Sequence, residues 1–244
     1  RLELEYLKTD KILSDHCILS TVVVFGSARI KSPEEAQEKV EQVRKMLEIS
    51  PDDGVLINAY KKAKNQLKNA HYYEQAIQFS KMISAHFQQH GKCHYVITTG
   101  GGPGIMEAAN LGAFESNARS IGLNITLPYE QTPNPFITPE LAFRFHYFAI
   151  RKMHFLVRAK ALVAFPGGFG TLDELFEVLT LVQTKKMEPI PIILFGSEFW
   201  NRAINFDFLV EEGMIHENDM KLFSIVDSVD EAFTMLQYFF AEHM

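Results

Sequence analysis

Short runs of apolar residues alternate along this chain with longer segments in which apolar residues recur every three or four positions. The short runs are typical of strands covered on both faces, and the periodic segments are typical of helices. The expected strands are residues 18–26, 94–98, 120–127, 161–165, 190–195 and 223–226. The expected helices are about 32–50, 55–90, 105–115, 144–160, 172–179, 197–212 and from 229 onward. This alternation predicts an α/β fold of three layers, a parallel sheet with helices on both faces.

The segment after the first expected strand is longer than a strand-to-helix connection requires. Ser32 is a good helix N-cap and Pro33 suits the first helical position, so a charged helix is expected to end near Ser50. A turn at 51–54 then leads into the next helical pattern. We interpret about residues 30–70 as a helical insertion after the first strand of a single domain that spans residues 1–244.

Composition and charge exclude several classes of protein. Of the 244 residues, 47% are hydrophobic and 22% are charged, which is ordinary for a globular protein and rules out disorder of the whole chain. The 24 Lys and Arg against 30 Asp and Glu give a net charge of −6. Non-specific nucleic-acid binding needs a basic face, so we expect no nucleic-acid partner.

Three further features bear on where the protein works. Cys17 and Cys93 are the two cysteines, too few for a disulfide framework. No apolar run approaches the roughly 20 residues of a membrane-spanning helix, and the charged first residues lack the apolar stretch of a signal peptide. We therefore expect a cytoplasmic protein with no membrane partner. Because the chain begins at Arg1 rather than Met, we expect native residues before it.

Two glycine-rich turns each follow an expected strand and open a helix. The first is TTGGGPGIMEAAN at 98–110 and the second is PGGFGTLDE at 166–174. Glycine lets the backbone approach a ligand closely, and the free N–H groups at a helix start attract anions, so a phosphate is the expected ligand. Neither turn matches the dinucleotide fingerprint or the P-loop. Both turns can also be read as tight connections alone, but their occurrence twice in one sheet favours a phosphate site.

The second turn is accompanied by side chains suited to chemistry. Thr171 can cap the following helix or reach a phosphate oxygen, and Glu174 lies close to the same cleft. The structural alternative for both is a capping box, or complementarity with the helix dipole. Arg151 precedes the strand that leads into this turn. It can point toward the same sheet edge or lie on the surface as an ordinary charged residue.

Together these residues resemble the LOG ("Lonely Guy") family of cytokinin riboside 5′-monophosphate phosphoribohydrolases, formerly mislabelled as lysine decarboxylases. The resemblance rests on Arg151-Lys152 followed by a strand and PGGFGTLDE, and it extends to FGSAR at 25–29 and GGGPGIMEAAN at 100–110. It covers about residues 22–29 and 72–233. Plant-type members have Met-His-Glu where this chain has Phe148-Ala149-Ile150, which indicates a bacterial branch with its own base preference.

The resemblance implies a Rossmann-like doubly wound sheet and a homodimer or larger homo-oligomer. It also implies an enzyme that cleaves the N-glycosidic bond of a purine nucleoside 5′-monophosphate, either AMP or an N6-substituted AMP, to free base and ribose 5-phosphate. An enzyme that acts on AMP in this way is an AMP nucleosidase. No metal or organic cofactor is required for this reaction.

The resemblance also implies the residues of the site. Glu174 and Arg151 match the catalytic positions. The implied substrate-binding residues are Gly167, Gly168, Gly170, Thr171, Gly101, Gly102, Ser27, Arg29, Lys152 and Glu107. The chemistry agrees, because a carboxylate stabilises an oxocarbenium-like sugar and an arginine holds phosphate or offsets charge on the departing purine.

Other interpretations remain open. His86, His90 and His94 are spaced by four, but Gly91 breaks the helix between them, so we expect no metal site. A non-catalytic nucleotide-binding or sensor protein on the same fold is the main alternative function. A molybdenum-cofactor carrier would share the fold but would give Glu174 no role. The preferred base, the oligomer size, the purpose of the insertion and the physiological pathway are not specified by the sequence.

Overall fold

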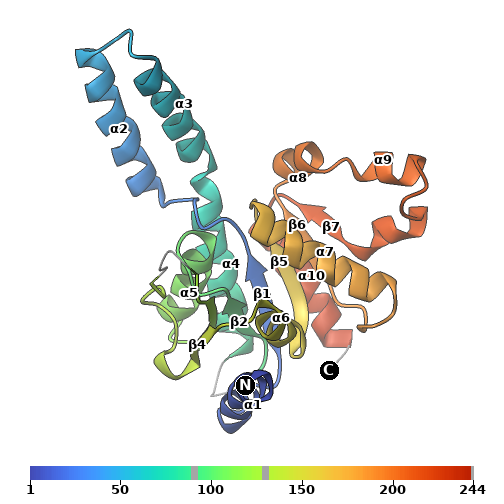
Figure 1. The fold of residues 1–244 in the computed structure, drawn as a ribbon. Helices are drawn as coiled ribbons and strands as arrows, with labels where there is room; N and C mark the ends of the chain where they lie inside the picture. Colours follow the sequence, from blue (N-terminus) through green and yellow to red (C-terminus); the bar gives the residue numbers. More distant parts are fainter. Residues whose placement is uncertain (89–92, 128–131, 243–244) are drawn as a thin grey trace.

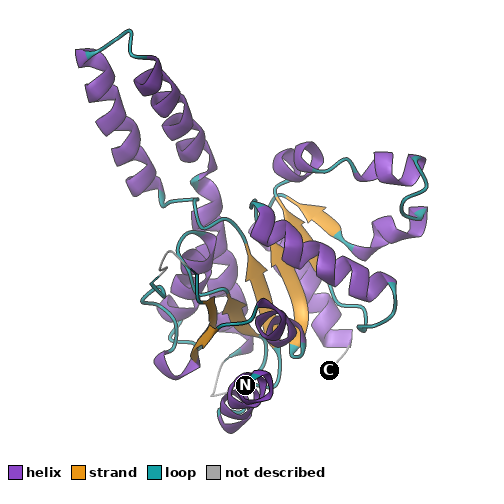
Figure 2. Ribbon diagram, in the orientation of Figure 1, coloured by secondary structure: helices purple, strands orange, loops and turns teal. Residues whose placement is uncertain are grey.

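A parallel β-sheet forms the centre of the fold (Figure 1 and Figure 2). The computed structural model describes residues 1–88, 93–127 and 132–242. Within these residues the strands lie in the order β4-β3-β2-β1-β5-β6-β7, and every neighbouring pair is parallel. The strands are β1 Thr21–Phe25, β2 Val96–Thr99, β3 Ser120–Ile125, β4 Ala142–Phe145, β5 Ala159–Ala164, β6 Ile192–Phe195 and β7 Ser224–Val226. The order runs outward from β1 in both directions, so it reverses between β1 and β5.

Helices cover both faces of the sheet because the strands carry apolar side chains on both sides. On β1, Val22 and Val24 pack on one face and Val23 and Phe25 on the other, and all four are buried. The first face is covered by α4 His71–Phe87, α5 Ile105–Glu115 and α10 Val229–Glu242. The second is covered by α1 Leu2–Asp15, α6 Phe148–Leu156, α7 Phe169–Gln183, α8 Ser197–Ala203 and α9 Phe206–Glu211. The predicted three-layer, doubly wound α/β fold is confirmed.

The helical insertion after the first strand is a hairpin that projects from the sheet (Figure 1). Its first helix is α2 Pro33–Ile49, where the Ser32 hydroxyl accepts a hydrogen bond from the Glu35 N–H at 3.2 Å, as the N-cap prediction requires. Its second helix is α3 Gly54–Asn69, and Asp53 accepts a hydrogen bond from the Val55 N–H at 2.7 Å. Each helix of the hairpin therefore begins at its own side-chain cap.

Several expected boundaries are wrong. The segment 144–160, expected to be mostly helical, contains the end of β4 and the start of β5 around the shorter helix α6. The expected helix at 55–90 divides at Ala70, and that at 197–212 divides into α8 and α9. Helix α1 was not predicted, and residues 128–131 lie outside the described residues.

The helices of the described ranges include none that is long and apolar enough to cross a membrane. The assignment of residues 1–244 to a single domain stays a prediction.

Candidate active site

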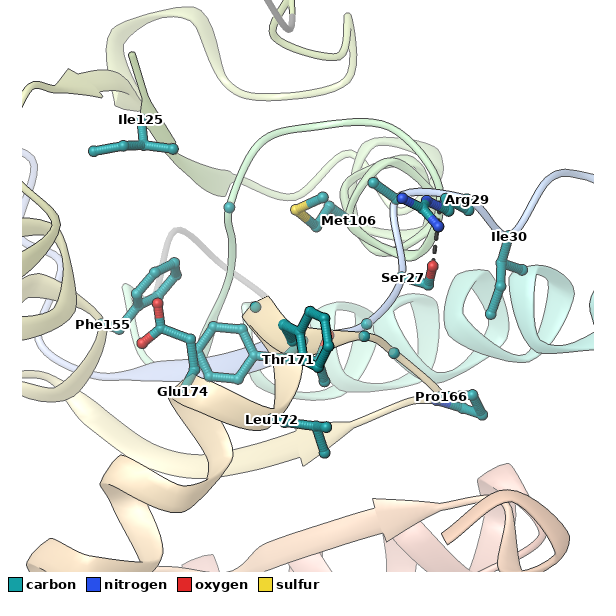
Figure 3. Close-up of a pocket in the computed structure, with 18 of the residues that line it drawn as sticks. Ser27, Arg29, Ile30, Met106, Ile125, Phe155, Pro166, Thr171, Leu172 and Glu174 are labelled. Carbon is teal, nitrogen blue, oxygen red and sulfur yellow. Dashed lines mark hydrogen bonds between the residues drawn. The ribbon is translucent and has the colours of Figure 1, made fainter. Parts of the chain in front are cut away.

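A cleft of about 830 Å³ opens at the carboxyl ends of β1 and β5. Ligands of open α/β sheets bind at this position, where the strand order reverses. The volume falls within the range of roughly 300–1,000 Å³ that small-molecule sites occupy. Figure 3 shows residues from the loop after β1, the turn after β5 and helix α7 converging on it. The topology and the cavity therefore indicate the same site.

Backbone hydrogen bonds of Ser27 connect the loop after β1 with the turns after β2 and β5, next to the cleft. Its N–H donates to the Pro166 carbonyl at 3.0 Å, and its own carbonyl accepts from the Ile105 N–H at 3.1 Å. Gly104 has a φ of +73°, and a Cβ there would collide with the Ser27 carbonyl oxygen. Glycine at that position is what allows the first glycine-rich turn to pack against the loop after β1.

The second glycine-rich turn leaves the start of α7 open to the cleft. The N-cap of α7 is Gly168, which makes no side-chain cap, so the capping box that was the structural alternative for Thr171 and Glu174 is absent at this helix start. A Cβ at Gly168 or Gly170 would meet nothing within 4 Å. The first N–H groups of a helix have no partner inside it, and the positive end of the helix dipole lies there. This open helix start is suited to an anion such as phosphate.

Arg151 and Glu174 form an ion pair inside the cleft. Arg151 Nη2 lies 3.1 Å from Glu174 Oε1, and the two side chains are only 14% and 6% exposed. The guanidinium carbon lies 5.3 Å from the centroid of the Phe148 ring and 5.4 Å from that of the Phe155 ring. Arg151 Nε is buried without a hydrogen-bond partner among the described residues. Helices α6 and α7 thus position the ion pair, and Arg151 Nε remains available to donate a hydrogen bond to a ligand.

Burial raises the pKa of Glu174 above its ordinary value, and the attraction of Arg151 and Lys152 only partly offsets this effect. The carboxylate therefore binds a proton more readily than an exposed glutamate does. A buried acid with a raised pKa beside one cation, inside a cleft, is typical of a site that transfers protons or stabilises developing charge.

The cleft gathers eight of the twelve site residues that the sequence predicts. Those that line it are Ser27, Arg29, Arg151, Gly167, Gly168, Gly170, Thr171 and Glu174. Gly101, Gly102, Lys152 and Glu107 are not among its described lining residues.

The four residues outside the lining have other contacts. The Gly101 N–H donates to Thr99 Oγ1 at 2.9 Å, and the Gly102 carbonyl accepts from Asn134 Nδ2 at 3.0 Å. Glu107 accepts a hydrogen bond from the Tyr73 hydroxyl at 3.1 Å. Lys152 pairs with Asp173 at 2.9 Å and with Glu177 at 3.0 Å. Their roles in binding stay predictions.

Sequence reasoning missed several residues of the cleft wall. Asn124, at the end of β3, is buried, and its Nδ2 has no hydrogen-bond partner in the described chain. A polar residue inside the apolar run at 120–127 was the signal for it. Gln66 and Asn69 of α3 and Phe199 of α8 also line the cleft. Gln66 and Asn69 lie on the polar side of a surface helix, so nothing in the sequence pattern marks them as cleft residues.

In the described part of the chain, no three His, Cys, Asp or Glu side chains gather as a metal site would require. His90, the middle residue of the spaced histidines, lies outside that part. The expectation that no metal or cofactor is needed stays a prediction.

The arrangement has a definite chemical capacity. The open start of α7 and the Arg29 side chain can hold an anion at one side of Thr171, and the Glu174 carboxylate lies at the other side (Figure 3). A ligand with a phosphate at one end would place its neighbouring carbon atoms next to that carboxylate. A carboxylate there can stabilise positive charge on the ligand or take a proton from water.

Comparison with known proteins adds an independent line of evidence. The family model described as possible lysine decarboxylase matches residues 106–236. A probable cytokinin riboside 5′-monophosphate phosphoribohydrolase of Oryza sativa subsp. japonica, LOG4, is 32% identical over 87 residues, which cover 35% of this chain and 38% of that protein. The cytokinin riboside 5′-monophosphate phosphoribohydrolase LOG1 of Arabidopsis thaliana is 28% identical over 148 residues, 59% of this chain and 68% of that one. The match to the rice protein thus spans less than half of its length.

A solved structure supports the fold alone. The X-ray structure of TM1055, a structural-genomics target, has a TM-score of 0.52 at 16% sequence identity and covers 90% of this chain and 99% of its own. The family model covers more than half of the 244 residues and includes both Arg151 and the PGGFGTLDE turn. The chain therefore belongs to the LOG family, whose model bears the description possible lysine decarboxylase.

Proposed function

We propose that this protein hydrolyses the N-glycosidic bond of a purine nucleoside 5′-monophosphate, releasing the free base and ribose 5-phosphate. The observation that carries the proposal is the buried Arg151–Glu174 pair beside the open start of α7. The names of the two plant relatives, phosphoribohydrolases of cytokinin riboside 5′-monophosphates, support the same reaction class.

The substrate has one orientation that satisfies the charges of the cleft. The 5′-phosphate binds the N–H groups at the start of α7 near Gly168 and Thr171, with Arg29 as its cation. The ribose then lies beside Glu174. The purine extends toward the apolar wall, where Met106, Phe148 and Ile125 line the cleft. A net charge of −6 does not oppose this substrate, because backbone N–H groups and one arginine bind the phosphate in this orientation.

The reaction follows from this placement. The C1′–N9 bond breaks, its electron pair moves to the purine, and the purine takes up a proton from solvent. Water attacks C1′ and gives its proton to Glu174, whose carboxylate also stabilises the oxocarbenium-like sugar. The proton that Glu174 accepts from the attacking water then returns to solvent, so the reaction consumes one water molecule. The raised pKa of Glu174 helps the carboxylate to hold that proton. Arg151 offsets the negative charge that develops on the departing purine.

The state of Lys152 argues against amine chemistry at this site. Burial lowers the pKa of Lys152, but hydrogen bonds to Asp173 and Glu177 outweigh burial, so the pKa is raised overall. A lysine that forms a Schiff base needs a lowered pKa. Lys152 is therefore suited to positioning α6 against α7, and the hydrolase is the better match to the site.

We also propose that the protein is a homodimer or larger homo-oligomer in the cytoplasm. Apolar side chains of α6, of the residue that follows it and of α7 lie exposed, namely Phe148, Met153, Val157, Phe169 and Phe176, and two of them, Phe148 and Phe169, line the cleft. Phe169 is 92% exposed at the turn that begins α7. A second copy of the chain would cover such a surface. Light scattering coupled to size-exclusion chromatography measures the assembly, and a monomer at micromolar concentration would contradict this.

A substrate panel tests the proposed reaction and identifies the base. The protein is incubated with AMP, an N6-prenylated AMP, GMP, CMP and UMP, and the products are separated by chromatography. We expect base release from the purine monophosphates, and the fastest substrate defines the enzyme as an AMP nucleosidase or a cytokinin-activating type. Thermal stabilisation by nucleotides without any base release would instead establish the non-catalytic sensor.

A further inference from the structure

The helical insertion contributes two side chains to the wall of the cleft. Gln66 and Asn69 lie three residues apart at the end of α3, so they share one face of the helix. Both are exposed, and both line the cleft. Neither side-chain amide has a hydrogen-bond partner among the described residues. Each therefore presents a free amide donor to a ligand.

The core of the fold, not the tip of the hairpin, holds these amides in place. The chain passes from α3 to α4 at Ala70, which keeps helical backbone angles of φ −63° and ψ −26° and is 1% exposed. Tyr72 and Tyr73 follow immediately and are buried against the sheet. The last turn of α3 is also joined to α8 by the ion pair between Lys68 and Glu198 at 2.6 Å. The backbone that carries Gln66 and Asn69 is thus anchored to the core beside the cleft.

The amides lie at the Arg29 end of the cleft. Ile30, the residue after Arg29, also lines the cleft, and it packs in the same apolar cluster as Tyr72 and Tyr73 at the start of α4. In Figure 3, Arg29 and Ile30 lie on one side of Thr171 and Glu174 lies on the other. The end of α3 leads directly into Tyr72 and Tyr73 of this cluster, which puts it on the Arg29 and Ile30 side of the cleft.

The charges at this end indicate what it binds. Glu174 is the acidic residue among the described cleft residues, and it lies at the opposite end. Arg29 has no carboxylate partner in the described part of the chain. One unpaired guanidinium, two free amides and an open helix start form a set of donors with no competing carboxylate. Such a set is suited to the oxygen atoms of a phosphate.

We propose that Gln66 and Asn69 bind the 5′-phosphate of the substrate from the side opposite the α7 helix start, and so make the insertion part of the substrate site. This inference rests on the substrate orientation given under the proposed function. The two amides then favour nucleotides over nucleosides. The cleavage itself, at the Glu174 end, does not involve them.

The test compares the double variant Gln66→Ala/Asn69→Ala with Asn65→Ala. Asn65 is exposed on the same turn of α3 but does not line the cleft, so the control loses an amide of the same kind. Titration calorimetry with ribose 5-phosphate measures binding of the phosphate without turnover, and AMP hydrolysis gives kcat and KM. Circular dichroism checks the helical content of each variant.

We expect the double variant to weaken ribose 5-phosphate binding and to raise the KM for AMP by about tenfold or more, because hydrogen bonds to a charged group are lost. Its kcat stays within about twofold of the wild-type value, and Asn65→Ala behaves as wild type. Unchanged ribose 5-phosphate binding in the double variant, or an equal loss in Asn65→Ala, would overturn the inference. If the wild type releases no base but its ribose 5-phosphate binding still depends on the two amides, the proposed reaction fails and this inference stands.

Discussion

Replacing Glu174 with glutamine removes one charge from the cleft and keeps the size of the side chain. Glutamine retains an oxygen that can accept the hydrogen bond from Arg151 Nη2, which is 3.1 Å from Glu174 Oε1 in the native protein. The substitution therefore tests the negative charge and leaves the packing of α6 against α7 intact. We expect the variant to fold and to bind AMP while losing most of its turnover.

The size of the loss follows from the charge interaction in the transition state. Two unit charges about 4 Å apart interact by about 4 kcal/mol at an effective dielectric constant of about 20. The Glu174 side chain is only 6% exposed, so solvent screens this interaction weakly. Each 1.4 kcal/mol or so corresponds to a factor of ten in rate, so kcat is expected to fall by about a thousandfold.

The assay is adenine release from saturating AMP, followed by chromatography. Glu177→Gln is the matched control, because Glu177 lies one turn further along α7 and pairs with Lys152, outside the main cleft. We expect the control to stay within about threefold of wild type. A Glu174→Gln enzyme whose kcat falls less than about tenfold would refute the charge-stabilisation argument.

Three further predictions concern the pair and the fold. In Arg151→Met, the cation that lowers the pKa of Glu174 is gone, so that pKa rises further and the acidic limb of the kcat–pH profile moves to higher pH; an unmoved limb would contradict this coupling. Burial already raises the pKa of Glu174 above its unfolded value, so the charged carboxylate costs stability at neutral pH. Glu174→Gln should therefore raise Tm at pH 7, and this gain in Tm should shrink as the pH falls toward 4.5. Scanning fluorimetry measures both effects. A lower Tm of the variant at pH 7 would contradict a destabilising effect of the charged carboxylate. In Gly112→Ala, the added methyl group would collide with the Ile77 carbonyl oxygen where α5 packs on α4. The free energy of unfolding, measured in urea, should therefore fall by about 1–3 kcal/mol. An unchanged free energy of unfolding would show that the two helices move apart without cost.

The sheet could be predicted from the sequence because its central strands are short runs made mostly of apolar and β-branched residues. Residues 21–25 are buried at every position, and so are 96–99. By contrast, β4 alternates exposed and buried positions over only Ala142–Phe145, within an aromatic stretch that also suits a helix. Helix α1 buries just Thr9 and Leu13, so its pattern is too weak to separate from a charged surface segment. Packing against α6 determines α1, and local sequence does not show that contact.

The candidate site was predictable only where special residues mark it. Glycines that open a helix start, and Glu174 with its fixed spacing from them, identified one side of the cleft. Gln66 and Asn69 lie far away along the chain, on a helix whose polar side resembles any solvated surface. Their position depends on how α3 continues into α4, which is a property of tertiary packing.

The most direct measurement is the product ratio after AMP is incubated with the purified protein. Adenine and ribose 5-phosphate, quantified by chromatography and mass spectrometry in one time course, should appear in a one-to-one ratio, with the oxygen of labelled water at C1′ of the sugar. Release of adenosine with inorganic phosphate, or recovery of intact AMP under conditions in which the nucleotide is bound, would contradict cleavage of the N-glycosidic bond.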